Sequence, residues 1–397
     1  MLELIIKKEN NVKKIALIKD GKLAEYYEDD EKINQNEENI YVGTIKDVLK
    51  GMQSAFIDVG TEKNAFIHLK DILPKVNEKE KKQEKQEVNI DIKDVVKEND
   101  KLLVQVKKGS DVQKGARVST HISLPSRYIV LMPNTTIITI SKKIKEEKEK
   151  QRLLNIVKNN LLKNTGAIIR TACEGKSENE LIQDIKYITN IWNKIQKKYN
   201  EGNIKSPALI YKSPDIAEKI IIDLFSKELT KVIVNDKEEY ERLISIKKEN
   251  DCFKSIEITL KEKEDILDCY DIKKQIEKIQ DRKIWLKCGG FITIDKTEAL
   301  TAIDVNTGKY IGKNNLEDTI YKVNEEATYE IVKQVKLRDI GGIIIVDYID
   351  MNNTKDKEKI ENLLKEELKE DRAKTQVEGF TKLELMEFTR KHICSHS

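Results

Sequence analysis

The stretch "LTAIDVNTGKYIG", residues 300–312, places Asp304 directly after the mainly apolar run 300–303. A run of this kind predicts a buried strand, in which a carboxylate is unexpected. The arrangement recurs in "GGIIIVDYIDM", residues 341–351, where Asp347 follows Ile343–Val346. Because the pattern occurs twice, the two aspartates call for a common explanation.

A long amphipathic helix is predicted between these two strands. Its apolar positions recur three and four residues apart, and Asn314 or Asn315 would cap it before Gly341 and Gly342 end it. These positions are Leu316, Ile320, Val323, Ala327, Ile331 and Val335. A strand–helix–strand unit usually brings its strands close together in one sheet. We therefore expect Asp304 and Asp347 to emerge at the same sheet edge.

Two converging carboxylates form a hard oxygen site that suits Mg²⁺ or Mn²⁺. Such an ion can polarise a phosphoryl oxygen and activate water, as phosphodiester hydrolysis requires. Asn306 lies on the same face as Asp304 if the strand continues, and Asp350 is a weaker candidate. The alternative is that both aspartates cap turns or helices at strand ends, and spacing alone leaves both readings open.

Composition narrows the class of protein. The 397 residues are 39% hydrophobic and 36% charged, which allows two or three domains, and no apolar run is long enough for a membrane helix. No signal peptide is visible, so we expect a cytoplasmic location. The five cysteines are widely spaced without a C-x-x-C pair, which argues against a disulfide framework. With a net charge of +3, nucleic-acid binding requires local basic clusters.

Short strands with glycine turns between residues 40 and 126 predict a small barrel of the OB type. The charge-dense stretch 77–101 is interpreted as a solvated loop or insertion. Phe56 and Phe66 on adjacent strands could stack unpaired bases, with Lys108 and Lys114 supplying charge for phosphates. The alternative is that both rings fill the barrel interior.

The remaining segments predict an α/β multidomain chain. Residues 1–36 show strand alternation with a turn at Lys19-Asp20-Gly21. Residues 142–200 have helical spacing around the short strand 166–172, and residues 207–280 alternate between strands and helices.

Several blocks resemble the ribonuclease E/G family of endoribonucleases. They include "NIYVGTIKDVLKGMQSAFIDVG", "KGARVSTHISLPSRYIVLMPN", "GAIIRTACEGKS", "TEALTAIDVNTGKYIG", "LRDIGGIIIVDYIDM" and "GFTKLELMEFTRK". The resemblance implies an RNase H-like domain split by an OB-fold RNA-binding barrel and a 5′-sensor region, followed by a DNase I-like catalytic subdomain. The implied bounds are 1–38 and 207–280 for the RNase H-like parts, 39–126 for the barrel, 127–206 for the sensor and 281–397 for the catalytic subdomain.

The resemblance also implies roles for individual residues. Asp304 and Asp347 match the aspartates that bind catalytic magnesium, and Asn306 matches the asparagine beside them. Phe56, Phe66 and Lys114 match RNA-contacting positions. Arg170 and Thr171, in "IIRTA", match the sensor for a 5′-monophosphate, which suits the planar fork of arginine.

The implied activity is metal-dependent cleavage of single-stranded RNA to 5′-phosphate and 3′-hydroxyl ends. A/U-rich, 5′-monophosphorylated substrates would be preferred, in processing of rRNA precursors and turnover of mRNA. The alternative is a non-catalytic RNA-binding or ribosome-associated protein, although carboxylates that repel phosphate have no use in pure binding.

The C-terminal sequence departs from the family pattern. Where many members carry a C-P-x-C zinc-link, this chain reads "RKHICSHS", with His392, Cys394 and His396. The departure puts structural zinc and the zinc-linked homodimer in doubt. The length of the chain favours a compact, ribonuclease G-like member.

Overall fold

A computed structural model describes residues 1–30, 37–72, 90–110, 114–201, 204–224, 229–249, 253–262, 265–308 and 316–394. The chain is mixed α/β and divides into two compact units. One unit combines Met1–Ile33 with Phe225–Ser397, and the other is Asn34–Leu224.

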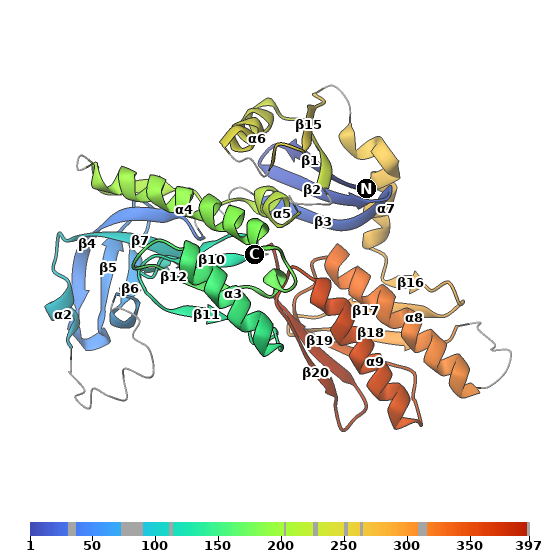
Figure 1. Cartoon of the computed structure of the whole chain (residues 1–397). Helices are drawn as coiled ribbons and strands as arrows, with labels where there is room; N and C mark the ends of the chain where they lie inside the picture. Colours follow the sequence, from blue (N-terminus) through green and yellow to red (C-terminus); the bar gives the residue numbers. More distant parts are fainter. Residues whose placement is uncertain are drawn as a thin grey trace. The chain divides into compact units, whose positions relative to one another are not determined.

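A five-stranded sheet in the first unit joins segments that are far apart in the sequence. Its order is β15-β14-β1-β2-β3, and β1 pairs in parallel with β14, so the blue N-terminal strands lie beside later, yellow ones (Figure 1). Asp20 and Gly21 have positive φ in the turn that joins β2 and β3, which confirms the predicted hairpin. The elements are β1 (Leu2–Glu9), β2 (Val12–Lys19), β3 (Lys22–Asp30), β14 (Leu229–Val234), α6 (Lys237–Glu249), β15 (Glu257–Leu260), η5 (Ile266–Asp271) and α7 (Ile272–Ile279).

A six-stranded sheet, in the order β16-β17-β18-β19-β21-β20, completes this unit. The long helix α8 and the helix α9 run along one face of it (Figure 1), where Val323, Ala327 and Ile331 share a core with Ile303 and Val305. The helix predicted between the two aspartates is confirmed, while its expected caps Asn314 and Asn315 lie outside the described residues. The elements are β16 (Lys283–Trp285), β17 (Phe291–Lys296), β18 (Leu300–Asn306), α8 (Leu316–Leu337), β19 (Gly342–Asp347), α9 (Thr354–Glu367), η6 (Leu368–Glu370), β20 (Thr375–Phe380) and β21 (Met386–Arg390).

The second unit contains the predicted OB-like barrel. The strands β4-β5-β6-β8-β7 follow one another in the sheet, and an additional pairing of β4 with β7 closes them into a barrel. The elements are β4 (Ile40–Leu49), η1 (Lys50–Met52), β5 (Ser54–Asp58), β6 (Ala65–His68), η2 (Leu69–Asp71), α2 (Ile92–Val95), β7 (Lys101–Lys108) and β8 (Arg117–Ser119).

The stretch 77–101 differs from the expected solvated loop in its second half. Ile92 and Val96 belong to the barrel core, since the short helix α2 closes the space beside β4. Residues 77–89 lie outside the described part of the chain.

The remainder of the second unit is a four-stranded sheet, β11-β12-β10-β9, with the helices α3 and α4 packed on it. Strand β12 ends at Ile169, earlier than the predicted 172, because Thr171–Cys173 form a 3₁₀ turn. The elements are β9 (Leu124–Pro125), β10 (Ile129–Met132), β11 (Ile138–Ile140), α3 (Glu147–Asn160), β12 (Gly166–Ile169), η3 (Thr171–Cys173), α4 (Glu178–Asn200), β13 (Ala208–Tyr211) and α5 (Ile216–Leu224).

The expected boundary at residue 207 is displaced. Strand β13 pairs with β4 of the barrel rather than with the five-stranded sheet, and its Ile210 packs into the core beneath α4. Later strands of the 207–280 segment do join that sheet, beginning with β14 at Leu229.

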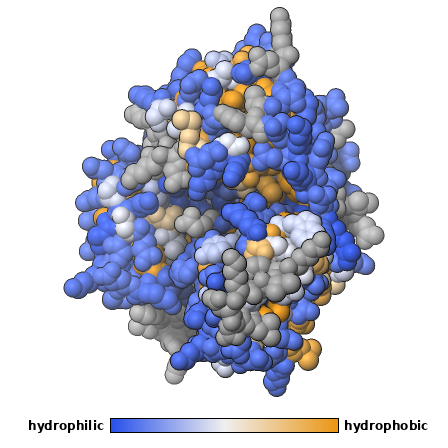
Figure 2. All heavy atoms as spheres, turned by 90° about the vertical axis from the view of Figure 1, so that its right-hand side faces the viewer, coloured by the Kyte–Doolittle hydropathy of each residue, from blue (hydrophilic) through white to orange (hydrophobic). Residues whose placement is uncertain are grey.

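On the face seen in Figure 2, the coloured surface is mainly hydrophilic, with hydrophobic residues scattered over it. None of the helices within the described ranges has both the length and the apolar character that crossing a bilayer requires.

Candidate active site and nucleic-acid interface

Asp304 and Asp347 lie directly opposite each other on neighbouring strands. β18 and β19 are parallel, and their register runs from Leu300 opposite Ile343 to Asp304 opposite Asp347. Adjacent strands are about 4.8 Å apart, so the two carboxylates are within reach of a single ion. Both residues are exposed.

The surroundings of Asp304 differ from those expected of a buried strand end. β18 continues to Asn306, and its residues alternate between core and solvent, with Ile303 and Val305 facing α8. The intervening Ala302, Asp304 and Asn306 therefore share the outer face of the sheet. The carboxylate is unexpected only if the strand is assumed to be buried on both faces.

Asn306 fixes the orientation of one carboxylate. Its side-chain amide donates a hydrogen bond of 2.6 Å to Oδ2 of Asp304, which leaves Oδ1 directed elsewhere. Beyond it, Gly308 has a φ of +60°, and a Cβ at this position would lie 2.5 Å from the carbonyl oxygen of Gly289. Glycine is therefore required to turn the chain away just past the carboxylate pair.

The segment after Asp347 is held from the other side of the sheet by a residue that the sequence pattern did not indicate. The buried side chain of Asn324, on α8, donates to the carbonyl of Ile349 and accepts from its amide, at 2.8 and 3.1 Å. This pair of bonds fixes the chain between Asp347 and Asp350. A polar residue inside an apolar helical stripe was the available signal.

The electrostatics of the pair favour a cation. Although Asp347 is exposed, partial desolvation of its carboxylate raises its pKa, and the negative charges of Asp304 and Asp350 raise it further. Mg²⁺ is commonly held by one or two carboxylates together with water. No group of three or more His, Cys, Asp or Glu side chains in the described residues is placed to hold a metal. The donor set thus fits an ion that keeps most of its water ligands.

Phe56 and Phe66 form a ring pair on the outside of the barrel. They are opposite each other on β5 and β6, with ring centroids 6.1 Å apart and planes inclined by 69°. Their neighbours Ala55, Ile57 and Ala65 fill the core instead. The interpretation that these rings fill the barrel is therefore wrong, and both are half-exposed.

A basic row continues from this ring pair. Phe66 is the register partner of Arg117 on β8, which in turn pairs with Lys108 on β7. Arg117 was not a candidate from the sequence, because only the strand register shows that it lies in this row. Its guanidinium forms an ion pair of 2.8 Å with Asp71. Lys114 is also exposed, and the next residue, Gly115, approaches the chain before Phe66 so closely that a Cβ would lie 2.0 Å from the carbonyl of Asn64.

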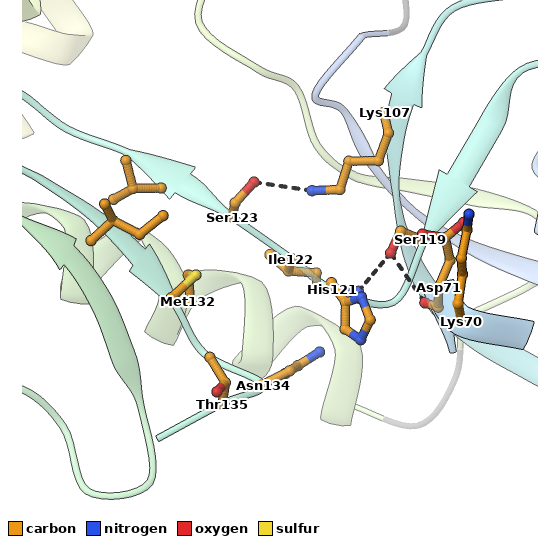
Figure 3. Close-up of a pocket in the computed structure, with 12 residues that line it drawn as sticks. Lys70, Asp71, Lys107, Ser119, His121, Ile122, Ser123, Met132, Asn134 and Thr135 are labelled. Atoms are coloured by element: carbon orange, nitrogen blue, oxygen red, sulfur yellow. Dashed lines mark hydrogen bonds between the residues drawn. The ribbon is translucent and has the colours of Figure 1, made fainter. Parts of the chain in front are cut away.

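A pocket of about 560 Å³ opens between the barrel and the four-stranded sheet. Figure 3 shows Lys107 reaching across it to the hydroxyl of Ser123, while Ser119 bonds to both Asp71 and the backbone of His121. The lining combines basic, polar and apolar side chains, as ligand pockets commonly do. It consists of Lys70, Asp71, Lys107, Ser119, His121, Ile122, Ser123, Val130, Met132, Asn134, Thr135 and Ile168.

Arg170 and Thr171 follow β12 at the end of the four-stranded sheet. Arg170 Nη1 donates to the carbonyl of Ser126 at 2.6 Å and lies 3.5 Å from a carboxylate oxygen of Asp223. The hydroxyl of Thr171 is 2.8 Å from that of Ser141. Arg170 is thus oriented by two partners, and its guanidinium is partly exposed.

Two carboxylates of the helices hold the chain around Arg170. Asp184 is buried on α4 and accepts bonds from the hydroxyl of Ser126 and the amide of Tyr128, at 2.6 and 2.9 Å. Glu149 on α3 accepts from Arg152 and from the amide of Gly175, and the Arg152 contact lowers the pKa of Glu149 to about 2.

The C-terminal residues surround a buried charge cluster. Arg390 is fully enclosed and bonds at 2.7 Å to Asp339 and at 2.7 Å to Asp371. The backbone amide of Cys394 donates to Asp339, and Nδ1 of His392 is 2.8 Å from the carbonyl of Asp339. His392 thus uses one ring nitrogen, and Cys394 its backbone amide, to hold Asp339, while the third candidate metal ligand, His396, lies outside the described residues.

Sequence comparisons show the family of this chain. The model of the ribonuclease E/G family matches residues 123–393, which include Arg170 and both aspartates. The chain belongs to the ribonuclease E/G family. It is 37% identical to ribonuclease G of Escherichia coli over 394 residues, covering 98% of this chain and 79% of that protein. It is also 37% identical to ribonuclease G of Haemophilus influenzae over 391 residues, with the same coverage of both chains.

Ribonuclease E of Buchnera aphidicola is also similar, at 32% identity over 392 residues, with 96% of this chain but only 39% of that protein aligned. The aligned part of these ribonuclease E/G family members includes the barrel, which precedes the region matched by the family model.

Proposed function

We propose that this endoribonuclease of the ribonuclease E/G family cleaves single-stranded RNA with a divalent metal ion at the outer face of the six-stranded sheet. The observation that carries the proposal is the opposite placement of Asp304 and Asp347 on parallel strands, with Asn306 bonded to the first. Neighbouring carboxylates repel each other and repel RNA unless a cation lies between them.

Asp304 and Asp347 would hold Mg²⁺, with Mn²⁺ as a substitute. When bound, the ion would polarise the phosphodiester and lower the pKa of water, to give a 5′-phosphate and a 3′-hydroxyl. Asn306 keeps one oxygen of Asp304 occupied and so orients the other. Asn324 holds the backbone beyond Asp347, so that the pair keeps its register.

The ring pair and the basic row of the barrel would bind the substrate. Phe56 and Phe66 offer faces for unpaired bases, and duplex RNA keeps its bases stacked and unavailable for such contacts. Lys108, Arg117 and Lys114 supply positive charge for the phosphates. Single-stranded RNA is the substrate class that uses both features.

Arg170 and Thr171 would recognise a 5′-monophosphate. A guanidinium held by a carbonyl and a carboxylate is already oriented, and Thr171 adds a hydroxyl and a backbone amide. A/U-rich substrates and roles in rRNA maturation and mRNA turnover complete the proposal, on the strength of family membership.

We also assign the two sheets of the first unit to subdomains of the family. The five-stranded sheet would be the RNase H-like part, and the six-stranded sheet with α8 and α9 would be the DNase I-like catalytic subdomain. A homodimer is a further expectation, for which sedimentation of the full chain is the measurement.

The test is cleavage of a 5′-monophosphorylated, A/U-rich oligonucleotide by wild type, Asp304→Asn and Asp347→Asn. We expect each substitution to reduce the rate by roughly 10²-fold or more. Asp295→Asn is a matched control, because Asp295 is on the same sheet face but paired with Arg282. An inert wild type with Mg²⁺, or aspartate variants that cut as wild type does, would contradict the proposal. RNA binding without any product would favour the non-catalytic alternative.

A further inference from the structure

A large exposed aromatic lies on the same sheet face as the carboxylate pair. Trp285, on β16, is 58% exposed, although aromatic rings of this size are usually covered. Its ring contacts that of Phe291 on β17, with centroids 5.3 Å apart and planes inclined by 61°. The two rings form one aromatic surface open to solvent.

A lysine accompanies the two rings. Lys283 Nζ lies 4.3 Å from the centroid of Trp285 and 3.5 Å from that of Phe291. The ammonium group is thus held by cation–π contacts on the face that also carries Asp304 and Asp347. Rings and ammonium together provide the two elements of nucleotide recognition, a surface for a base and a charge for a phosphate.

Strand register places these rings close to Asn306, the neighbour of Asp304. Trp285 is opposite Phe291, and Phe291 is opposite Asn306. In the next row, Lys283 is opposite Thr293, which is opposite Asp304. With strands about 4.8 Å apart, the rings lie one and two strands from Asn306, roughly 5 to 10 Å away.

We propose that Trp285, Phe291 and Lys283 form a nucleotide subsite that holds one unpaired base next to the bond to be cleaved. The proposal rests on the assignment of cleavage to the Asp304–Asp347 pair. The base packs on the exposed ring of Trp285, and Lys283 contacts a flanking phosphate. This contact offsets the repulsion between the RNA backbone and the aspartates, so the substrate can approach them.

The tryptophans of this chain report directly on the subsite. There are two, and Trp192 is only 5% exposed within α4, whereas Trp285 is open to solvent. A base stacked on Trp285 quenches its fluorescence and shields it from acrylamide. The measurement uses the wild-type chain in EDTA, so binding is observed without cleavage.

We expect single-stranded RNA to quench the emission of wild type and of Trp192→Phe, but not that of Trp285→Phe. An oligonucleotide scanned with single abasic residues should lose the quenching at one position. Trp285→Ala should weaken binding about tenfold, as loss of one stacked base predicts. Tyr329→Ala is the matched control, since Tyr329 is an exposed aromatic of α8, on the opposite side of the sheet.

Bound RNA without quenching, wild-type affinity of Trp285→Ala, or absence of RNA binding would each overturn the subsite. The rings of Trp285 and Phe291 would then only cover the edge strand β16. The subsite and the cleavage proposal fail separately. A chain that quenches but never cuts RNA refutes cleavage at the aspartates, whereas a chain that cuts without quenching refutes the subsite.

Discussion

Asp304 and Asp347 place two negative charges side by side on neighbouring strands. Desolvation of the carboxylate raises the pKa of Asp347, and repulsion by Asp304 and Asp350 raises it further. Without metal, the native state takes up a proton on Asp347 more readily than the unfolded chain does. Stability therefore falls as pH rises from the ordinary aspartate pKa through the raised one.

Asp347→Asn should accordingly raise the melting temperature of the metal-free protein at neutral pH. The gain should shrink as pH falls below the ordinary aspartate pKa, because wild type is then protonated too. Thermal unfolding in EDTA at pH 7 and in acid measures both effects. Asp295→Asn should not stabilise, since Arg282 lowers the pKa of Asp295, and a gain equal to that of Asp347→Asn would refute the repulsion argument.

Individual residues were predictable to different degrees. Asp304, Asn306 and Asp347 were candidates because they interrupt or follow apolar runs, and the structure brings them together. Arg117 and Trp285 were not, because the roles proposed for them come from which residue faces them across a strand pair. Register is set by long-range pairing that no local pattern reveals.

At the scale of elements, the strands and the long helix α8 followed from periodicity, since each buries one side. Periodicity did not predict the packing of two short elements, α2 and β13. The charged sequence around Ile92 hides a helix whose apolar side completes the barrel core. The partner of β13 was likewise not visible, because a short apolar strand fits either sheet.

Glu149 joins α3 to the turn before α4, and the stability that it contributes should depend on pH. Because Arg152 lowers the pKa of Glu149 to about 2, this pair stabilises the fold above the ordinary glutamate pKa of 4.5. The contribution is lost as pH falls from there towards 2. Glu149→Gln should therefore lower the free energy of unfolding at pH 7 and leave it nearly unchanged near pH 2.

Denaturant titrations of Glu149→Gln, Arg152→Gln and the double variant at both pH values test this link. The two single effects should be strongly non-additive at pH 7. Additive losses, or an equal loss at low pH, would show that the two side chains act independently.

The strand β21 is anchored through Arg390, which lies between two buried aspartates. Arg390→Met would leave Asp339 and Asp371 buried without their partner, at a cost of about 3–5 kcal/mol. Arg282→Met removes an exposed ion pair and should change little. Chemical denaturation compares the two variants, and similar stabilities would exclude a structural role for the buried cluster.

At the scale of the whole molecule, the chain combines a ring-bearing barrel, an oriented arginine and a carboxylate pair on separate sheets. Family membership makes the chain an endoribonuclease. The proposed roles of these three features, in binding RNA, in recognising its 5′ end and in cleaving it, can be tested one at a time.

Arg170→Ala should slow cleavage of 5′-monophosphorylated RNA more than cleavage of the same RNA with a 5′-hydroxyl. A loss of about tenfold in discrimination corresponds to one charge-assisted contact. Arg170→Lys keeps the charge but not the planar fork, and it should recover only part of the preference. Equal slowing of both substrates would remove Arg170 from this role.

A change of metal preference tests the central claim most directly. In Asp304→Cys, one hard oxygen ligand becomes a softer thiolate, which Mg²⁺ accepts poorly and Mn²⁺ accepts better. RNA cleavage by this variant should be lost with Mg²⁺ and partly restored with Mn²⁺, while wild type cuts with both. Wild-type activity of Asp304→Cys with Mg²⁺, or a folded variant that fails to respond to Mn²⁺, would contradict a catalytic metal between Asp304 and Asp347.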